Sequence, residues 1–334
     1  MINLSKVSIG NEQLLKKLTD SFKNKTFSNS TILTAPKGTG KATFALNFIC
    51  NILSSNKLNK VSTNLIYNNS HPNIKYLSIE FDEKNNKFKN NITIDQIRNL
   101  ENFLYQSSFN NLPKFIIIDT ADDLNSNSAN SILKMLEEPK NNSYFILLSN
   151  NISNLLPTIR SRCVKFNINK PNKTEFNQIL NLYNDNFETD NINFLYELSN
   201  GSPGIAIKID IEKLNELYSF IIKIIVDEKN ILSNDLIQLS EIVSNFSKDE
   251  FEIFLILLRF IIMKIVKNNL GILDNNEYSS FLLKDIFNMS VNIDNKFLFN
   301  ILDFLNMNEK NLIIYNLDKK IFCLNIFTPS KYRL

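Results

Sequence analysis

Short apolar runs alternate with helical stretches through the first half of this 334-residue chain. The apolar residues of these runs are consecutive rather than alternating, which is typical of strands in a sheet that is covered on both faces. The predicted strands are residues 31–34, 74–79, 115–119 and 144–149. A helical pattern over 128–138 lies between the last two, with Asn125 and Ser126 able to cap it and Pro139 to end it. Strand–helix alternation of this kind predicts a parallel α/β sheet with right-handed crossovers.

The pattern changes near Pro171, beyond which only helical periodicity remains, interrupted by a Gly-Ser-Pro-Gly turn at 201–204. The chain is also too long for one ordinary domain. We therefore predict an α/β domain of the P-loop type over residues 1–168, a small helical lid over 169–208 and an all-helical domain over 209–334. Two helical segments, 251–265 and 313–327, are apolar over more than one stripe. Their excess apolar area must be buried in the domain's own core or against other subunits, and we favour the second.

Composition narrows the class of protein. Hydrophobic residues make up 43% of the chain, enough for real cores, and a formal net charge of +3 is too small for tight, autonomous nucleic-acid binding. The three cysteines lie far apart with no CxxC pair, so neither a disulfide framework nor a cysteine zinc site is expected. The first ten residues lack the apolar core of a signal peptide, and the most apolar stretch, 251–266, carries three charges. We expect a cytoplasmic protein without a membrane span.

A glycine-rich loop, APKGTGKAT at residues 35–43, follows the first predicted strand and precedes an apolar helix. In a phosphate loop the glycines let backbone N–H groups close on an anion at a helix N-terminus, and the lysine adds charge. The candidate phosphate-binding residues are therefore Gly38, Gly40, Lys41 and Thr43.

The loop departs from the GxxxxGK[ST] pattern at two positions. Ala35 replaces the first glycine, and Ala42 replaces the Ser or Thr whose hydroxyl holds Mg²⁺. Thr43 is one residue late, which turns it about 100° around the helix. The loop is either a fossil that keeps the turn without useful nucleotide affinity, which we favour, or a site of weak residual binding.

A second degenerate motif ends the strand at 115–119. Asp119 stands where the Asp of a Walker B motif orients Mg²⁺. In active ATPases the next residue is an acid that activates water, but here it is Thr120, which cannot act as a base at neutral pH. For Asp122 and Asp123, a loop or helix-cap role is the favoured interpretation. Two degenerate motifs in one site predict lost ATP hydrolysis.

Three segments in this order resemble the bacterial clamp-loader AAA+ family: ITIDQIR (92–98), FIIIDTADDLNSNSANSILKMLEEP (115–139) and LLPTIRSRC (155–163). The resemblance is strong over residues 1 to about 208. In that family the arginine of the Ser-Arg-Cys motif projects into the ATP site of the next subunit, and the resemblance assigns this role to Arg162. A guanidinium suits the task, because its fork of donors matches a γ-phosphate. The alternative is that Arg162 pairs with a local carboxylate. Arg160 is the less suitable finger, and Cys163 begins a strand as a packing thiol.

The losses resemble the delta-prime type of this family rather than its gamma/tau motor type. Motor subunits keep an intact phosphate loop, an acid after the Walker B Asp and an arginine near position 204, where this chain has Gly204. The resemblance implies a non-hydrolysing stator in a five-membered ring with motor and delta subunits. That ring loads the sliding clamp onto primed DNA within the DNA-directed DNA polymerase III holoenzyme. Whether the chain has any enzymatic activity of its own is left open. The alternatives are an active gamma/tau-type ATPase and a stand-alone nucleic-acid-binding AAA+ protein.

Members of the family commonly carry a four-cysteine zinc module between the first helix of the domain and its next strand. Residues 51–73 contain no cysteine here, and the single histidine, His71, precedes Pro72 in a predicted turn. We therefore expect no zinc and no required cofactor, with a vestigial ATP site as the one cofactor site the chain offers.

Overall fold

The computed structural model describes residues 9–54, 60–82, 87–140, 142–183, 189–226, 234–272, 293–315 and 317–328. The chain divides into two compact units. The first consists of Met1–Ile179 together with Ser202–Gly204, and the second of Leu180–Gly201 together with Ile205–Leu334.

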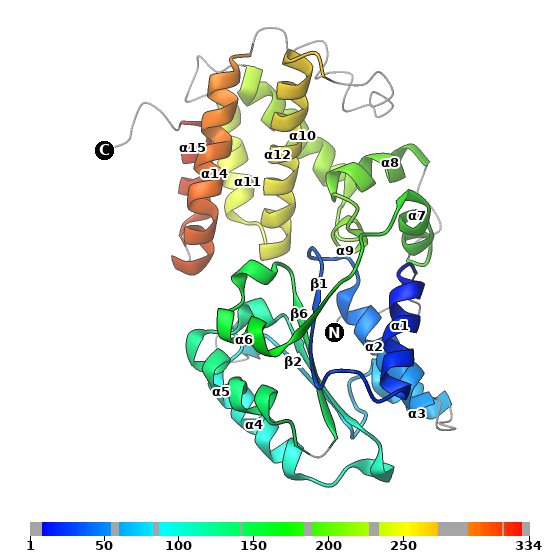
Figure 1. Cartoon of the computed structure of the whole chain (residues 1–334). Helices are drawn as coiled ribbons and strands as arrows, with labels where there is room; N and C mark the ends of the chain where they lie inside the picture. The colour runs from blue at the N-terminus through cyan, green and yellow to red at the C-terminus, as the bar shows by residue number, and fades with distance from the viewer. Residues whose placement is uncertain are drawn as a thin grey trace. The chain divides into compact units, whose positions relative to one another are not determined.

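A five-stranded sheet forms the centre of the first unit (Figure 1). Its order is β2-β5-β6-β1-β7, and every pairing is parallel. The strands are β1 (Ser30–Thr34), β2 (Ile74–Ser78), β5 (Lys114–Asp119), β6 (Ser143–Ser149) and β7 (Val164–Asn167). The four strands predicted from continuous apolar runs are present, and β7 begins directly after Cys163.

Helices cover both faces of this sheet (Figure 1). One face carries α1 (Glu12–Lys23), α2 (Lys41–Ser54) and α3 (Lys60–Tyr67), and the other carries α4 (Ile94–Tyr105), α5 (Ser126–Glu137) and α6 (Pro157–Arg162). Strand β5 supplies both cores, because alternate side chains of a strand point to opposite faces. Phe115 and Ile117 lie in the first cluster, and Ile116 and Ile118 in the second. Burial on both faces is why this strand reads as a continuous apolar run.

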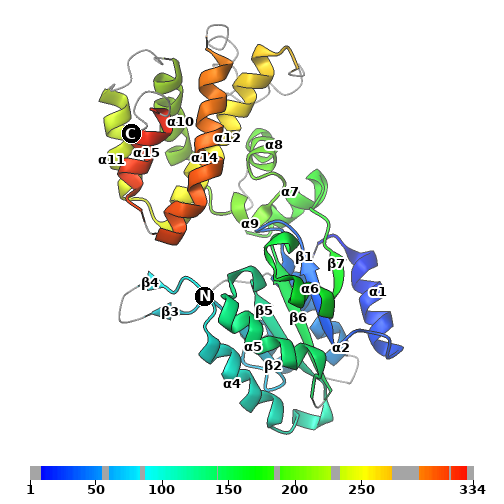
Figure 2. The same cartoon turned by 60° about the vertical axis from the view of Figure 1, so that its left-hand side comes forward.

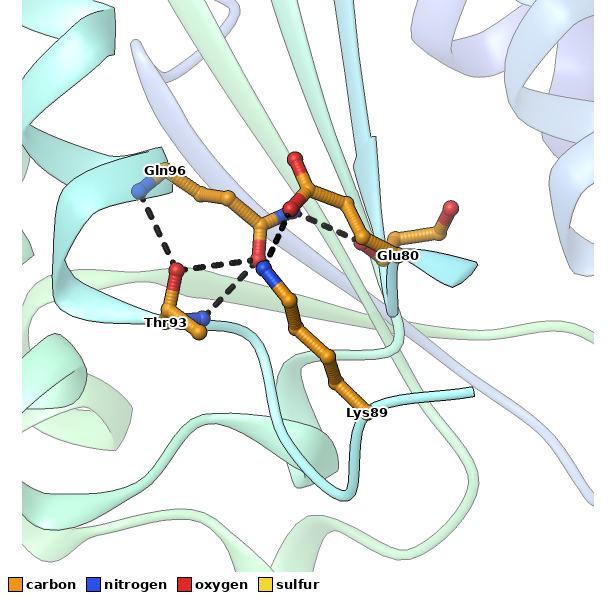
Figure 3. A network of polar contacts seen from close by, with 5 residues as sticks. Glu80, Lys89, Thr93 and Gln96 are labelled. Atoms are coloured by element: carbon orange, nitrogen blue, oxygen red, sulfur yellow. Dashed lines mark hydrogen bonds and ion pairs between the residues drawn. The ribbon is translucent and has the colours of Figure 1, made fainter. Parts of the chain in front are cut away.

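The segment ITIDQIR forms the start of α4 (Figure 3). Thr93 is the N-cap, and its side chain and that of Gln96 form a reciprocal capping box. The amide of Gln96 also donates to the carbonyl of Ser78 at 2.9 Å, which ties the helix to the end of β2. Nearby, Lys89 pairs with Glu80 at 2.8 Å across a two-stranded hairpin, β3 (Phe81–Asp82) and β4 (Lys87–Phe88). That hairpin lies apart from the main sheet (Figure 2).

After β7, every element in the described ranges is helical. The predicted architecture is therefore present: a parallel α/β sheet domain followed by helices. These are α7 (Lys173–Asn181), α8 (Thr189–Leu198), α9 (Pro203–Ala206), α10 (Ile211–Val226), α11 (Asn234–Ser244), α12 (Lys248–Asn269), α14 (Asn295–Tyr315) and α15 (Lys319–Phe327). The predicted segment 313–327 is not one helix, because α14 ends at Tyr315 and Asp318 caps a new one. None of the described helices is both long and apolar enough to cross a membrane.

Helix α12 buries more than one stripe within its own unit. Phe254, Leu257, Leu258, Ile261 and Ile262 are all fully buried. Helices α8, α10 and α14 pack around it, so much of its apolar area lies in the core of its own unit, while Met263 on the same helix stays 46% exposed. The favoured burial against other subunits stays a prediction.

Helix α8, placed by sequence in the lid, packs against α12. The ammonium of Lys264 donates to Glu197 at 2.9 Å, and the rings of Phe194 and Phe260 meet edge to face at 5.7 Å. These contacts group α8 with the C-terminal helices.

Candidate functional site

The glycine-rich loop connects β1 to the start of α2 and has the backbone of a phosphate loop. Gly38 and Gly40 have φ values of 77° and 89°, in the left-handed region that glycine adopts without a Cβ penalty. Lys41 is the first residue of α2. The sequence-predicted residues Gly38, Gly40, Lys41 and Thr43 are thus together at a helix N-terminus.

The ammonium of Lys41 is bound within the chain. It donates to the carbonyl of Ala35 at 2.8 Å, to the carbonyl of Pro36 at 2.9 Å and to Oδ1 of Asn150 at 2.8 Å. A lysine has three N–H donors, so these acceptors use all of them. Burial lowers the pKa of Lys41 to about 8, although the nearby carboxylates of Asp119 and Asp122 act in the opposite direction.

Asn150 was not singled out from the sequence, and Asp122 holds it in place. The carboxylate of Asp122 accepts from the backbone N–H of Asn150 at 2.7 Å and from the hydroxyl of Ser149 at 3.1 Å. The backbone N–H of Asn151 completes the set at 3.4 Å. Asp122 is therefore not a helix cap: it joins the end of β5 to the end of β6. One signal could have found Asn150, because it follows a predicted strand whose carboxyl end lies beside the phosphate loop.

Asp119, the residue in the Walker B position, accepts a hydrogen bond from the hydroxyl of Tyr76 on the neighbouring strand β2. Burial raises the pKa of Asp119, while the hydrogen bond from Tyr76 lowers it. Thr120 donates its hydroxyl to Asp123 at 2.7 Å. The residue that follows Asp119 is thus a threonine whose hydroxyl is engaged by a carboxylate three positions on.

Ala42, which stands where a magnesium-binding hydroxyl is expected, is followed by Thr43 at the start of α2. The partly buried side chain of Ala42 packs against the hydrophobic cluster under α2. Thr43 is partly exposed one residue further along, and its hydroxyl has no hydrogen-bonding partner among the described residues. Neither supplies a magnesium ligand at the required position.

The last three residues of the Gly-Ser-Pro-Gly turn, Ser202–Gly204, belong to the first unit and lie directly against the phosphate loop. The backbone N–H of Gly204 donates to the carbonyl of Gly38 at 2.8 Å, and the hydroxyl of Ser202 donates to the carbonyl of Lys37. A Cβ at position 204 would lie 3.0 Å from both the Cα and the carbonyl oxygen of Gly38. A side chain at position 204 would therefore require the turn or the loop backbone to shift by a few tenths of an ångström.

Arg162 ends α6 on the other side of the sheet and pairs with a local carboxylate. Its Nε donates to Oε1 of Glu137 at 2.5 Å, its Nη2 pairs with the same oxygen, and its Nη1 donates to the carbonyl of Thr158 at 2.9 Å. The side chains of Arg162 and Glu137 are 31% and 47% exposed. The sequence had left this pairing open as the alternative to a finger. It engages three of the five N–H donors of the guanidinium, which leaves one on each terminal nitrogen.

Arg160, the other arginine of the motif, is partly exposed, and its Nε is buried without a hydrogen-bonding partner among the described residues. Cys163 is buried in the core cluster under α4 to α6, and burial raises its pKa to about 12. It is a packing thiol.

His71 is a buried turn residue, as its sequence context predicted. Its Nδ1 accepts from the backbone N–H of Asn73 at 3.2 Å, and burial lowers its pKa. In the described ranges, no group of three or more His, Cys, Asp or Glu side chains is placed to hold a metal ion. The expected lack of zinc remains a prediction.

A family model matches residues that lie within the first unit of this chain. Residues 10–172 match the family described as DNA polymerase III, delta subunit. The DNA polymerase III subunit delta′ of Pseudomonas aeruginosa is 32% identical over 140 residues, 40% of this chain and 41% of that protein. The delta′ subunit of Haemophilus influenzae is 36% identical over 112 residues, 34% of this chain and 32% of that protein. The aligned region therefore spans less than half the length of these relatives.

Two further similarities are weaker. The DNA polymerase III subunit gamma of Buchnera aphidicola subsp. Schizaphis graminum is 30% identical over 120 residues, 35% of this chain and 33% of that protein. A solved gamma-subunit-related protein from Thermotoga maritima is 20% identical, covering 92% of this chain and 99% of that one, with a TM-score of 0.42.

Proposed function

We propose that this chain is a delta-prime-type stator subunit of a DNA polymerase III clamp loader, without ATPase activity of its own. The similarity of residues 10–172 to the family described as DNA polymerase III, delta subunit, and of part of the chain to two delta′ subunits, supports this proposal. In this proposal the chain assembles with motor and delta subunits and supplies Arg162 to the ATP site of a neighbouring subunit. The ring then loads the sliding clamp onto primed DNA in the cytoplasm.

The observation that carries the proposal is that the ammonium of Lys41 already uses its three donors on acceptors of its own chain. In a working loop the lysine binds the β- and γ-phosphates. Here a nucleotide would have to displace three acceptors from Lys41 and the Gly204 backbone from Gly38. Magnesium would also lack the hydroxyl that Ala42 removes, and attacking water would lack the base that Thr120 removes.

The arginine supports the second half of the proposal. Arg162 lies at the end of α6, partly exposed, and in the described ranges its hydrogen bonds go only to Glu137 and Thr158. It therefore has no hydrogen bond to the chain's own phosphate loop. Its two remaining donors suit the charge that spreads over a γ-phosphate during transfer.

The test is reconstitution of the full chain with its cognate gamma/tau-type and delta subunits. ATP hydrolysis is measured for the chain alone, for the motor and delta subunits without it, and for the complete set with clamp and primed DNA. We expect background turnover by the chain alone and faster turnover by the complete set than by its parts. Turnover by the chain alone at a rate typical of AAA+ motors would contradict the proposal and favour the gamma/tau-type alternative, to which the similarity to a gamma subunit also points.

A further inference from the structure

The carboxylate of Glu137 holds the guanidinium of Arg162 by one edge. Both Nε and Nη2 face the same oxygen, Oε1, while Nη1 is held by the carbonyl of Thr158 on the same helix as Arg162. A planar group held by a neighbouring helix on one side and its own helix on the other has a fixed plane. Arginine side chains are otherwise long and mobile, and ordering one costs conformational entropy.

The donors that remain are placed for one kind of ligand. A guanidinium has five N–H groups, and the contacts with Glu137 and Thr158 use one on each nitrogen. One N–H is left on Nη1 and one on Nη2, the pair that can bind two oxygens of one phosphoryl group.

The position of Glu137 is locally unfavourable for a carboxylate. It is the last residue of α5, and the C-terminal end of a helix carries partial negative charge. The pairing with Arg162 offsets this repulsion. The next residue, Glu138, is also exposed at the end of the same helix, yet it makes no ion pair among the described residues. The two adjacent glutamates therefore carry the same charge, but only Glu137 pairs with Arg162, which makes Glu138 a matched control.

We infer that Glu137 is a positioning residue for the trans-acting arginine: it orients the guanidinium of Arg162 so that the free edge meets the phosphate of a neighbouring subunit's ATP. This inference rests on the proposed function, because it requires Arg162 to act in trans. It predicts that Glu137 affects the chemical step at the neighbouring site rather than the affinity of that site for ATP.

The experiment is single-turnover ATP hydrolysis by the reconstituted complex with clamp and primed DNA, with Glu137→Gln, Glu137→Asp and Glu138→Gln in the full chain. Hydrolysis at the ATP site that this chain serves is identified as the kinetic phase that Arg162→Ala slows or removes. An ion pair of this exposure is worth up to about a factor of five. We expect Glu137→Gln to slow that phase about fivefold at unchanged half-saturating ATP, Glu137→Asp to recover most of the rate, and Glu138→Gln to match the wild type.

A second arm separates positioning from general structural damage. In the Arg162→Ala background, Glu137→Gln should have no further effect, because its target is gone. If Glu137→Gln leaves the phase unchanged or accelerates it while Arg162→Ala slows it, Glu137 does not position the arginine and the inference is wrong. If Arg162→Ala itself has no effect, the proposed function fails first, and the two failures are told apart.

Discussion

The phosphate loop and the Arg162 surface belong to the same unit but use their cations in opposite ways. Lys41 is 5% exposed and spends every donor on acceptors of its own chain. The side chain of Arg162 is 31% exposed and keeps donors on both terminal nitrogens after its local contacts are counted. In the proposed function this difference has a meaning: the chain's own groups take the place of a ligand at Lys41, and Arg162 keeps donors available for another molecule.

The largest expected effect comes from Arg162→Ala. Removing the guanidinium should leave the fold and the assembly intact but slow hydrolysis at the one neighbouring site by on the order of 10³. Because the other sites of the ring are untouched, the total ATPase rate should fall only in part and clamp loading should fall further. Arg162→Lys should restore little, since an ammonium keeps the charge but loses the planar fork.

The measurement is hydrolysis and clamp loading by assembled complexes, with size-exclusion chromatography to verify equal assembly. Normal clamp loading by correctly assembled Arg162→Ala complexes would contradict the role proposed for Arg162.

Gly204→Ala tests the close contact between the Gly-Ser-Pro-Gly turn and the phosphate loop. The added Cβ would lie 3.0 Å from two backbone atoms of Gly38, so either the turn or the loop must move. We expect a loss of about 1–3 kcal/mol in the free energy of unfolding of the first unit, the usual cost of overpacking a close contact. Urea denaturation of the full chain, followed by a probe in the first unit, measures it. An unchanged midpoint would mean that the Gly-Ser-Pro-Gly turn does not lie this close to the loop in solution.

Lys41→Met tests the burial of the Lys41 ammonium through the pH dependence of the free energy of unfolding. The pKa of Lys41 falls from 10.5 to about 8 on folding, so between these values the unfolded chain binds more protons and stability rises with pH. Replacing the lysine should remove this contribution, on the order of 1–3 kcal/mol across the window. The measurement is the pH dependence of unfolding from pH 7.5 to 10.5, with Lys37→Met, an exposed position in the same loop, as the control. Identical slopes for the wild type and Lys41→Met would show that Lys41 is not buried as described.

The sequence predicts most of the first unit and little of what surrounds its functional residues. The parallel strands were legible because their burial on both faces makes them continuous apolar runs, and the loop because its glycines are adjacent. The partners of these residues lie elsewhere in the chain. Asn150 is 109 positions from Lys41, Tyr76 is 43 from Asp119, and Glu137 is 25 from Arg162. No local pattern marks such pairs, since only the sheet order brings them together.

For the C-terminal helices, prediction from the sequence was limited in a different way. Periodicity predicted that these helices exist, but it did not predict what their apolar surface packs against. A helix that is apolar on more than one face can be a core helix or an interface helix, and the pattern is the same for both. Helix α12 packs against α8, α10 and α14 within its unit, and Met263 on the same helix stays 46% exposed. Burial of the remaining apolar surface against other subunits stays a prediction.

The smallest expected effect is that of Ala42→Thr combined with Thr120→Glu. These changes return a magnesium ligand and a catalytic acid to the motifs. Hydrolysis by the isolated chain should nevertheless stay at background, because Lys41 and Gly204 still close the loop and no arginine stands near position 204. Single-turnover hydrolysis at saturating ATP measures it. A gain to the rate of an AAA+ motor would show that the two residues, and not the closed loop, are what silences the site.

The most direct test of the closed loop is equilibrium binding of Mg²⁺-ATP to the isolated full chain, measured by titration calorimetry at physiological pH. With every donor of Lys41 engaged and Gly204 on the loop backbone, we predict no saturable binding at micromolar or low millimolar ATP. Binding of one ATP per chain with micromolar affinity, abolished by Lys41→Met, would show that the loop opens for a nucleotide and would contradict the account.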